Sequence, residues 1–146
     1  LETGGSQRGS KVIYDRAASA VTSLDPEEVD WQAVFEGAQW FHWTGITAAL
    51  GERARRTLEH ACQAAVAAGV TISCDLNFRK KLWTEAEAQA VMRPLMKYVD
   101  VCIANEEDAH KSLGMTAGET DVDKGHLDEE GYAKLALRLK ETYGFS

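Results

Sequence analysis

The sequence predicts an α/β fold of three layers, in which helices cover both faces of a mainly parallel sheet. Three apolar runs of strand length, at 40–43, 70–74 and 99–104, alternate with segments whose apolar residues recur at helical spacing. Each connection between two runs is long enough for a helix, as parallel strands require, and this favours right-handed βαβ units. The second run, VTISC, carries no charge and is typical of a strand buried on both faces.

The first part of the chain is predicted to contain a short strand, a helix and a second strand. Residues 11–14 (KVIY) suit an edge strand or a flap. Asp25 is expected to cap a helix that has Pro26 at its first position and ends near Gly37. The aromatic run WFHW at 40–43 indicates a buried strand.

Two helices are predicted to connect the three core strands. Apolar residues between 53 and 68 recur at steps of three and four, and Gly69 stands where the helix should end. The face that this helix buries should consist of Ala54, Leu58, Ala61, Cys62, Ala65 and Val66. Thr84 and Glu87 form a capping box at the start of the next helix, and Pro94 either kinks that helix or begins another.

The last part of the chain is predicted to add two helices and a loop. Asn105 caps a helix that runs to Gly114, and the polar, acidic segment 116–126 indicates a surface loop. Residues 128–142 form a final helix with Tyr132, Leu135, Ala136 and Leu139 on one face.

Composition narrows the class of protein. The 146 residues suffice for one globular core, and the net charge of -7 disfavours binding to nucleic acid or to an anionic membrane surface. No apolar stretch approaches the roughly 20 residues that cross a bilayer. Cys62, Cys74 and Cys102 lie far apart in apolar runs, which predicts reduced, buried thiols and a cytoplasmic protein.

A cluster of polar side chains follows the second core strand. Asp75, Asn77, Arg79, Lys80 and Lys81 put an acid, an amide and three cations within seven residues. Ligands of parallel sheets bind beyond the carboxyl ends of the strands, and a guanidinium there can bind a carboxylate or a phosphate. The alternative is that the acid and the amide cap local backbone groups while the cations are solvated.

A second polar cluster, acidic apart from its first residue, follows the third core strand. Asn105 is followed by Glu106, Glu107 and Asp108, which suit the positive end of a helix dipole. Simple capping is one explanation of the pattern, although three negative charges are more than a cap requires. The functional alternative is that Asn105 and one carboxylate organise water around Mg²⁺ on the phosphates of a nucleotide.

Three further features of the sequence are a Tyr–Arg pair, a histidine in the aromatic run and the serines. Tyr14 and Arg16 would share one face of an extended strand and could grip the carboxylate or hydroxyls of a small acid, although a surface pair without function is an equal alternative. His42 lies inside the aromatic run and is expected to be a hydrogen-bonded core residue. No base stands at a recognisable spacing from Ser73 or the other serines near strands, so a hydrolase triad has no support.

At four segments the chain resembles the ribokinase-like, PfkB-type carbohydrate kinases, and within them the 2-keto-3-deoxygluconate kinases. The segments are SKVIYDRA at 10–17, WFHWTGIT at 40–47, DLNFR at 75–79 continuing to LW at 82–83, and ANEEDA at 104–109. They occur in the order and spacing of the family and span nearly the whole chain.

The resemblance implies a partial ribokinase-like domain. Residues 1–16 would form a lid or substrate-flap strand, and residues 17–146 the central βαβ portion of the kinase core. Tyr14, Arg16 and Arg79 would contact a small-molecule sugar acid, supported by Asp75 and Asn77. The lid strand is also a candidate surface for homo-oligomerisation.

The resemblance also implies the cofactors ATP and Mg²⁺. Asn105 and Asp108 would lie on the nucleotide and phosphate side, and Asp108 and Glu107 would approach the metal through water. The family usually has Glu where this chain has Asp108, one methylene shorter. The catalytic Asp base is expected beyond Ser146, so this chain by itself is expected to be inactive.

Three readings of function remain open from the sequence. The first is transfer of the γ-phosphoryl group of ATP to the 6-hydroxyl of 2-keto-3-deoxygluconate. The second is another sugar kinase of the same fold, of the fructokinase or ribokinase type. The third is a non-catalytic, truncated α/β module that binds a partner.

Overall fold

The computed structural model describes residues 13–16, 18–116 and 129–146. The predicted loop at 116–126 therefore lies outside the described residues, except for its first position. The first two residues of the predicted strand at 11–14 also lie outside them. Residues 13 and 14 have no regular secondary structure, so the predicted edge strand is absent from its described half.

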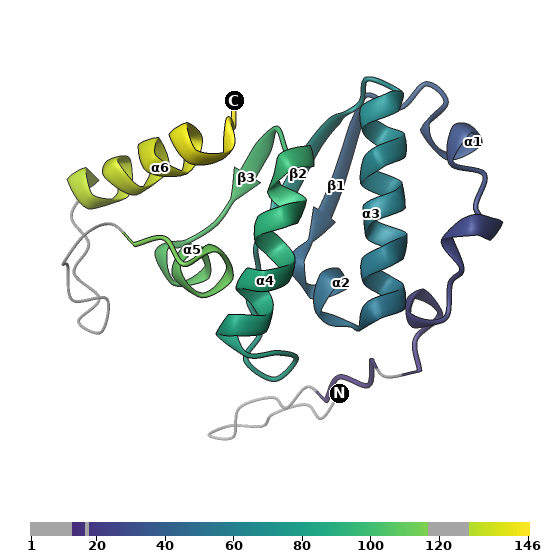
Figure 1. Ribbon diagram of the computed structural model, residues 1–146, viewed down its shortest axis with the longest axis horizontal. Helices are drawn as coiled ribbons and strands as arrows, with labels where there is room; N and C mark the ends of the chain where they lie inside the picture. The colour runs from purple at the N-terminus through teal and green to yellow at the C-terminus, as the bar shows by residue number, and fades with distance from the viewer. Residues whose placement is uncertain (1–12, 17, 117–128) are drawn as a thin grey trace, which may run out of the picture.

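The sheet consists of three parallel strands in the order β1-β2-β3, as Figure 1 shows. The strands are β1 (Trp40–Thr44), β2 (Thr71–Asp75) and β3 (Val101–Ile103). All three predicted core strands are thus confirmed, although β3 is shorter than the apolar run that predicted it. Parallel pairing of consecutive strands confirms the α/β class and the βαβ connections.

Helices fill every connection between the strands. The α-helices are α1 (Trp31–Phe35), α2 (Gly45–Ala49), α3 (Glu52–Ala67), α4 (Glu85–Leu95), α5 (Glu106–Leu113) and α6 (Glu129–Tyr143). Short 3₁₀ helices are Ala20–Thr22, Pro26–Glu28 and Met96–Tyr98. In Figure 1, α3 and α4 lie on the near side of the sheet.

The core lies between the sheet and these helices. Side chains alternate along a strand, and Trp43 on β1, only 4% exposed, joins the buried cluster with Ile72 of β2. Trp40 on the opposite face of β1 is 58% exposed, and Ile103 on β3 is 51% exposed. The described residues thus form a sheet covered by helices on one face, and the prediction of a buried strand at 40–43 is wrong for half of its side chains.

The predicted helix from Asp25 to Gly37 is two separate helices. Asp25 accepts a hydrogen bond from the Glu27 N–H at 3.1 Å, as a cap should, but the 3₁₀ turn that it opens ends at the extended residue Val29. Asp30 then caps α1 by accepting from the Ala33 N–H at 3.0 Å. A second capping residue five positions after the first explains the break.

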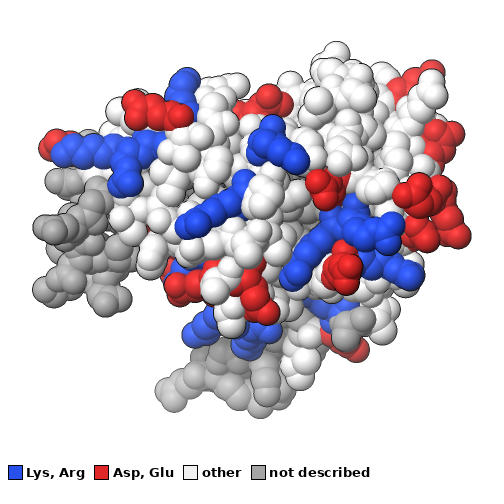
Figure 2. Space-filling model, viewed as in Figure 1, with Lys and Arg blue, Asp and Glu red and all other residues white. Residues whose placement is uncertain are grey.

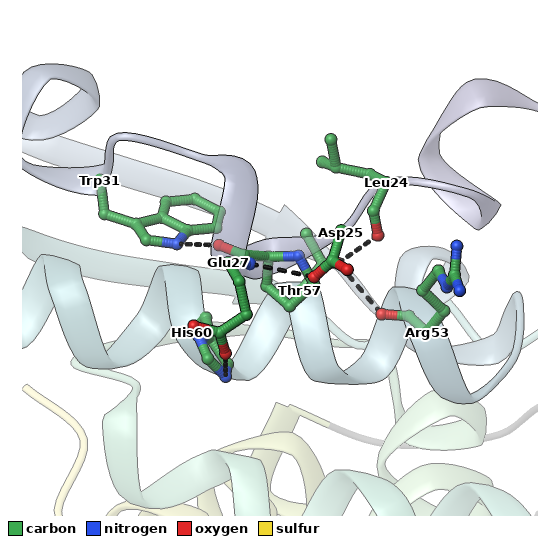
Figure 3. A network of polar contacts seen from close by, with 8 residues as sticks. Leu24, Asp25, Glu27, Trp31, Arg53, Thr57 and His60 are labelled. Carbon is green, nitrogen blue, oxygen red and sulfur yellow. Dashed lines mark hydrogen bonds and ion pairs between the residues drawn. The ribbon is translucent and has the colours of Figure 1, made fainter.

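This amino-terminal segment is fastened to α3 by hydrogen bonds between side chains and backbone (Figure 3). Thr57 of α3 donates to the Leu24 carbonyl at 3.3 Å. The Trp31 indole donates to the Pro26 carbonyl at 2.9 Å, which closes the segment on itself. The segment therefore packs along α3.

The boundaries of α3 and α4 follow the predictions closely. Gly69 has φ +69°, a left-handed conformation that suits the residue after a helix. Both bonds of the Thr84–Glu87 capping box are present at the start of α4. Pro94 lies within α4, which continues to Leu95. One residue of the predicted α3 face is wrong: Val66 is 54% exposed.

The last two helices are also confirmed. Asn105 caps α5, and Gly114 ends it with φ +69°. On α6, Leu135 and Leu139 are buried as predicted, whereas Tyr132 is exposed. Within the described part of the chain, no helix is both long and apolar enough to cross a membrane.

The surface charge is mixed on the face seen in Figure 2. Basic and acidic side chains alternate across it, with a group of acidic side chains at the right, beside α1. Charges of both signs are therefore mixed on this face.

Candidate functional site

The carboxyl ends of the three strands bring together the two polar clusters of the sequence. Thr44 at the end of β1 pairs in register with Asp75 at the end of β2, and Asp75 pairs with Ile103 at the end of β3. The loop after β2 carries Arg79, and the loop after β3 leads into α5. This edge of a parallel sheet is where ligands are expected to bind.

The loop after β2 is held from the β1 side by Asn77. This residue has φ +43°, in the left-handed region that Asn tolerates better than most residues. Its Nδ2 donates to Thr44 Oγ1 at 3.1 Å. Thr44 also accepts from the Ile46 N–H at 3.5 Å at the start of α2, so one hydroxyl links two strand ends.

The same loop is held from the β3 side by Asp108. Asp108 Oδ1 accepts a hydrogen bond from the Phe78 N–H at 3.0 Å. Asn105 caps α5 by accepting from the Asp108 N–H at 2.7 Å. Desolvation is the main cause that raises the pKa of Asp108, which the Phe78 N–H partly offsets and the charge of Asp75 reinforces.

Glu107 and Lys111 form a second pair on α5. Lys111 Nζ lies 2.6 Å from Glu107 Oε1 and 5.4 Å from the centre of the Phe78 ring. The hydrogen bond from Lys111 lowers the pKa of Glu107 and raises that of Lys111.

The predicted metal residues are therefore already engaged with protein groups. Asp108 Oδ1 bonds to Phe78, and Glu107 pairs with Lys111. Among the described residues, no group of three or more His, Cys, Asp and Glu side chains could hold a metal ion. The oxygen donors have the chemistry that Mg²⁺ prefers, but the ion would need water and phosphate oxygens to complete its ligands.

Arg79 lies on the exposed surface of this loop. Its Nη1 donates to the Phe78 carbonyl at 2.8 Å, so the guanidinium folds back over its own loop. Lys80 and Lys81 beside it are exposed. Asp75, half-buried, is near enough to influence Asp108 electrostatically. The acid, amide and cations predicted to lie at this strand end therefore do so.

Tyr14 and Arg16 contact each other, as the spacing suggested. Arg16 Cζ lies 4.2 Å from the centre of the Tyr14 ring, a cation–π contact. Tyr14 is exposed, and no hydrogen bond or ion pair in the described part of the chain links this pair to Arg79. Their contact with a substrate stays a prediction.

A serine–histidine pair on the open face of the sheet was not predicted. His42 Nδ1 lies 2.8 Å from Ser73 Oγ, and the Trp40 indole donates to the same oxygen at 2.7 Å. His42 is exposed, so its predicted place in the core is wrong, whereas Ser73 is only 2% exposed. Two ring partners and burial of the hydroxyl indicate a structural role.

Sequence reasoning gave no role to Thr44 and Gly45. The available signal is local: a Thr-Gly pair stands between a strand and a helix, at the edge where ligands bind. A Cβ on Gly45 would overlap the Leu76 carbonyl oxygen, so this position has room only for glycine.

Comparison with known proteins identifies the family. Residues 2–142 match the family described as pfkB family carbohydrate kinase, and the chain belongs to that family. The fold is that of this family, and the predicted resemblance is confirmed.

Individual relatives are kinases of deoxy keto acids. The chain is 43% identical over 113 residues to the 2-dehydro-3-deoxygalactonokinase of Haloferax volcanii, covering 77% of this chain and 35% of the relative. It is 32% identical over 108 residues to the 2-dehydro-3-deoxygluconokinase of Thermoproteus tenax, covering 73% and 32%. The chain thus spans about a third of the length of these relatives.

Solved structures agree with the fold. The 2-dehydro-3-deoxygluconokinase of Thermotoga maritima matches with a TM-score of 0.84 and 49% identity, over 97% of this chain and 41% of that one. A ribokinase II candidate from E. coli, solved with ATP and Mg²⁺, matches with a TM-score of 0.62 at 19% identity, over 88% of this chain and 37% of that one. The second match supports the fold alone.

Proposed function

We propose that the complete protein transfers the γ-phosphoryl group of ATP to the 6-hydroxyl of 2-keto-3-deoxygluconate. The observation that carries this proposal is the 49% identity, across 97% of the chain, to a 2-dehydro-3-deoxygluconokinase with the same fold. Two further relatives are kinases of deoxy keto sugar acids. The substrate class therefore rests on three separate matches.

Cationic and phenolic groups would bind the sugar acid. Arg79 is exposed at the carboxyl end of β2, where a guanidinium can take a carboxylate in a bidentate arrangement. Tyr14 and Arg16 are already in contact and would close over the substrate from a lid formed by residues 1–16. Asn77 and Asp75 would support Arg79 by shaping its loop.

The phosphate side would be formed by the start of α5. Asn105 and Asp108 face the same strand edge as Arg79, and Asp108 and Glu107 are the carboxylates that would approach Mg²⁺ through water. When bound, Mg²⁺ would neutralise part of the negative charge on the phosphates of ATP. Residues 17–146 would form the central portion of the kinase core. We expect the base that accepts the proton of the 6-hydroxyl to come from residues beyond Ser146.

The second candidate substrate is 2-keto-3-deoxygalactonate. One relative is a 2-dehydro-3-deoxygalactonokinase and two are 2-dehydro-3-deoxygluconokinases, and the two keto acids differ in the configuration of one carbon. Neutral sugars of the fructokinase or ribokinase type would leave Arg79 and the Tyr14–Arg16 pair with no carboxylate to bind. A non-catalytic module would bind without turnover. We also propose that the complete protein is cytoplasmic, where ATP is available, and that residues 1–16 are a surface for homo-oligomerisation.

The proposal is tested by a coupled kinase assay on the complete protein with ATP and Mg²⁺. The acceptors are the gluconate-derived and galactonate-derived keto acids, fructose and ribose. We expect kcat/KM for a deoxy keto acid to exceed that for either neutral sugar by about a hundredfold or more, because a neutral sugar has no carboxylate to pair with Arg79 and with the Tyr14–Arg16 pair. Preference for a neutral sugar would contradict the proposal, and absence of turnover with every acceptor would favour the binding module.

A further inference from the structure

The backbone of Phe78 is bonded on both of its polar groups by charged side chains. Its N–H donates to Asp108 Oδ1 at 3.0 Å, and its carbonyl accepts from Arg79 Nη1 at 2.8 Å. Asp108 belongs to α5 and Arg79 to the loop after β2. One residue of backbone therefore connects a carboxylate on the phosphate side with the guanidinium on the substrate side.

The bond from Asp108 to Phe78 is not helix capping. Asp108 is the third residue of α5, the position from which a capping-box side chain reaches back to the N-cap backbone. Glu87 occupies the same position in α4 and accepts there from the Thr84 N–H at 2.7 Å. Asp108 Oδ1 accepts from another loop, 30 residues away in the sequence.

A second contact from the same helix fixes the side chain of Phe78. Lys111 Nζ lies 5.4 Å from the centre of the Phe78 ring, and the ring is buried in the core cluster. Glu107 holds this ammonium group at 2.6 Å. Residues of α5 thus fix both the ring and the backbone N–H of Phe78, and leave its carbonyl pointing to Arg79.

We propose that Asp108 is a positioning residue for substrate binding: it holds the Phe78 backbone and thereby sets where the Arg79 guanidinium meets the carboxylate of the sugar acid. This inference rests on the proposed function and gives Asp108 a second role besides the phosphate-side role above. Positioning of Phe78 needs a hydrogen-bond acceptor at Oδ1, whereas a role near Mg²⁺ needs the negative charge. The two roles can therefore be separated by substitution.

The test compares Asp108→Asn with Asp108→Ala in the complete protein. Asn keeps an acceptor oxygen and removes the charge, and Ala removes both. We expect Asp108→Ala to raise the KM for the sugar acid about tenfold or more, as loss of a hydrogen bond to a charged group does. Asp108→Asn should keep that KM within about threefold. Any effect on kcat or on the KM for ATP reports the phosphate-side role instead.

Hydrogen exchange gives a readout that does not depend on catalysis. The amide of Phe78 should exchange slowly in the wild-type protein and in Asp108→Asn, and faster in Asp108→Ala. A proteolytic peptide covering residues 75–82 reports this amide by mass spectrometry. If Asp108→Ala fails to fold, Asp108→Asn still tests the proposal, because the acceptor remains while the charge is gone.

Two results would overturn the inference. One is an equal rise in the sugar-acid KM for both variants, which would show that charge and not the acceptor matters. The other is unchanged exchange of the 75–82 peptide in Asp108→Ala. A wild-type protein without kinase activity would refute the proposed function, whereas the exchange result would still decide whether Asp108 holds the loop.

Discussion

Gly45 lies directly against the carbonyl oxygen of Leu76, so closely that a Cβ on Gly45 would overlap that oxygen. Gly45 begins α2 immediately after β1, and Leu76 follows the last residue of β2. The close approach of the two backbones places Thr44 Oγ1 3.1 Å from Asn77 Nδ2. The shape of the Arg79 loop therefore depends on the absence of a side chain on the neighbouring strand end.

Substitution of Gly45 by Ala should destabilise the protein. The added carbon would collide with backbone, which cannot move aside as a flexible side chain can, and we expect a loss of about 1–3 kcal/mol in the free energy of unfolding. Urea denaturation measures this loss. Ala90→Ser, which adds one atom to an exposed residue of α4, is the matched control and should change stability by less than about 0.5 kcal/mol. Equal stability of the two variants would contradict the prediction.

At Asn77 the usual preference for Ala over Gly should be reversed. Both Asn77→Gly and Asn77→Ala lose the bond to Thr44, but only Ala must also adopt φ near +43°. We expect Asn77→Ala to be less stable than Asn77→Gly by about 1–2 kcal/mol in urea denaturation. At the exposed position Ala90 in the middle of α4, by contrast, Gly should be the less stable residue by about 1 kcal/mol. The same order at both positions would show that the loop relaxes out of the left-handed region.

Removal of the Arg79 guanidinium should raise the KM for the sugar acid and leave the KM for ATP nearly unchanged. Because Arg79 is assigned to the carboxylate of the sugar acid, Arg79→Ala in the complete protein should raise the KM for that acid about tenfold or more. The KM for ATP should stay within about threefold. Lys81→Ala, an exposed cation two residues later, is the control for loss of positive charge. An equal rise in the KM for both substrates would contradict the assignment of Arg79 to the carboxylate of the sugar acid.

The capping box of α4 should make stability depend on pH. Hydrogen bonds from the Thr84 N–H and hydroxyl lower the pKa of Glu87 below its usual value of 4.5. A carboxyl whose pKa is lowered by folding stabilises the folded state above its unfolded pKa, and this contribution is lost as pH falls through the folded pKa. Glu87→Gln cannot titrate, so thermal melts should show it approaching wild-type stability as pH drops below about 4.5. Parallel stability curves from about pH 6 to about pH 3 would rule out this role for Glu87.

The three thiols should be inert in the folded protein. Burial raises the pKa of Cys62 and of Cys102 to about 12 and raises that of Cys74 as well, and thiols react as thiolates. We expect a thiol reagent at about pH 8 to label none of them rapidly before unfolding, and all three in denaturant. Rapid labelling of Cys102, which is only partly buried, would indicate that the edge at β3 opens.

Much of the fold could be predicted because its signals are local. Thr84 and Glu87 lie three residues apart, Asn105 bonds to the third residue after it, and Gly69 and Gly114 each end a helix by their own backbone conformation. Strand positions follow from apolar runs of the right length. These features require only the chemistry of neighbouring residues, which the sequence displays directly.

The predictions from sequence were wrong where the exposure of a strand or helix depends on which other elements cover it. The aromatic run at 40–43 predicts a buried strand, but Trp40 and His42 lie on the face of the sheet that the described helices do not cover. The helix predicted from Asp25 to Gly37 breaks at Val29 because Asp30 offers a second cap. Periodicity shows which side chains share a face and does not show whether that face is covered.

The sequence by itself determined the α/β class, the helix caps and the polar residues at the strand ends, since each depends on spacing within a few positions. Only the tertiary structure decided which of those residues meet. Thr44 and Asn77 are 33 residues apart, and Asp108 and Phe78 are 30 apart, yet each pair shares a hydrogen bond. The physical reason is that parallel pairing brings the ends of separate strands to one edge of the sheet, and packing of α5 against that edge then selects Phe78 as the partner of Asp108.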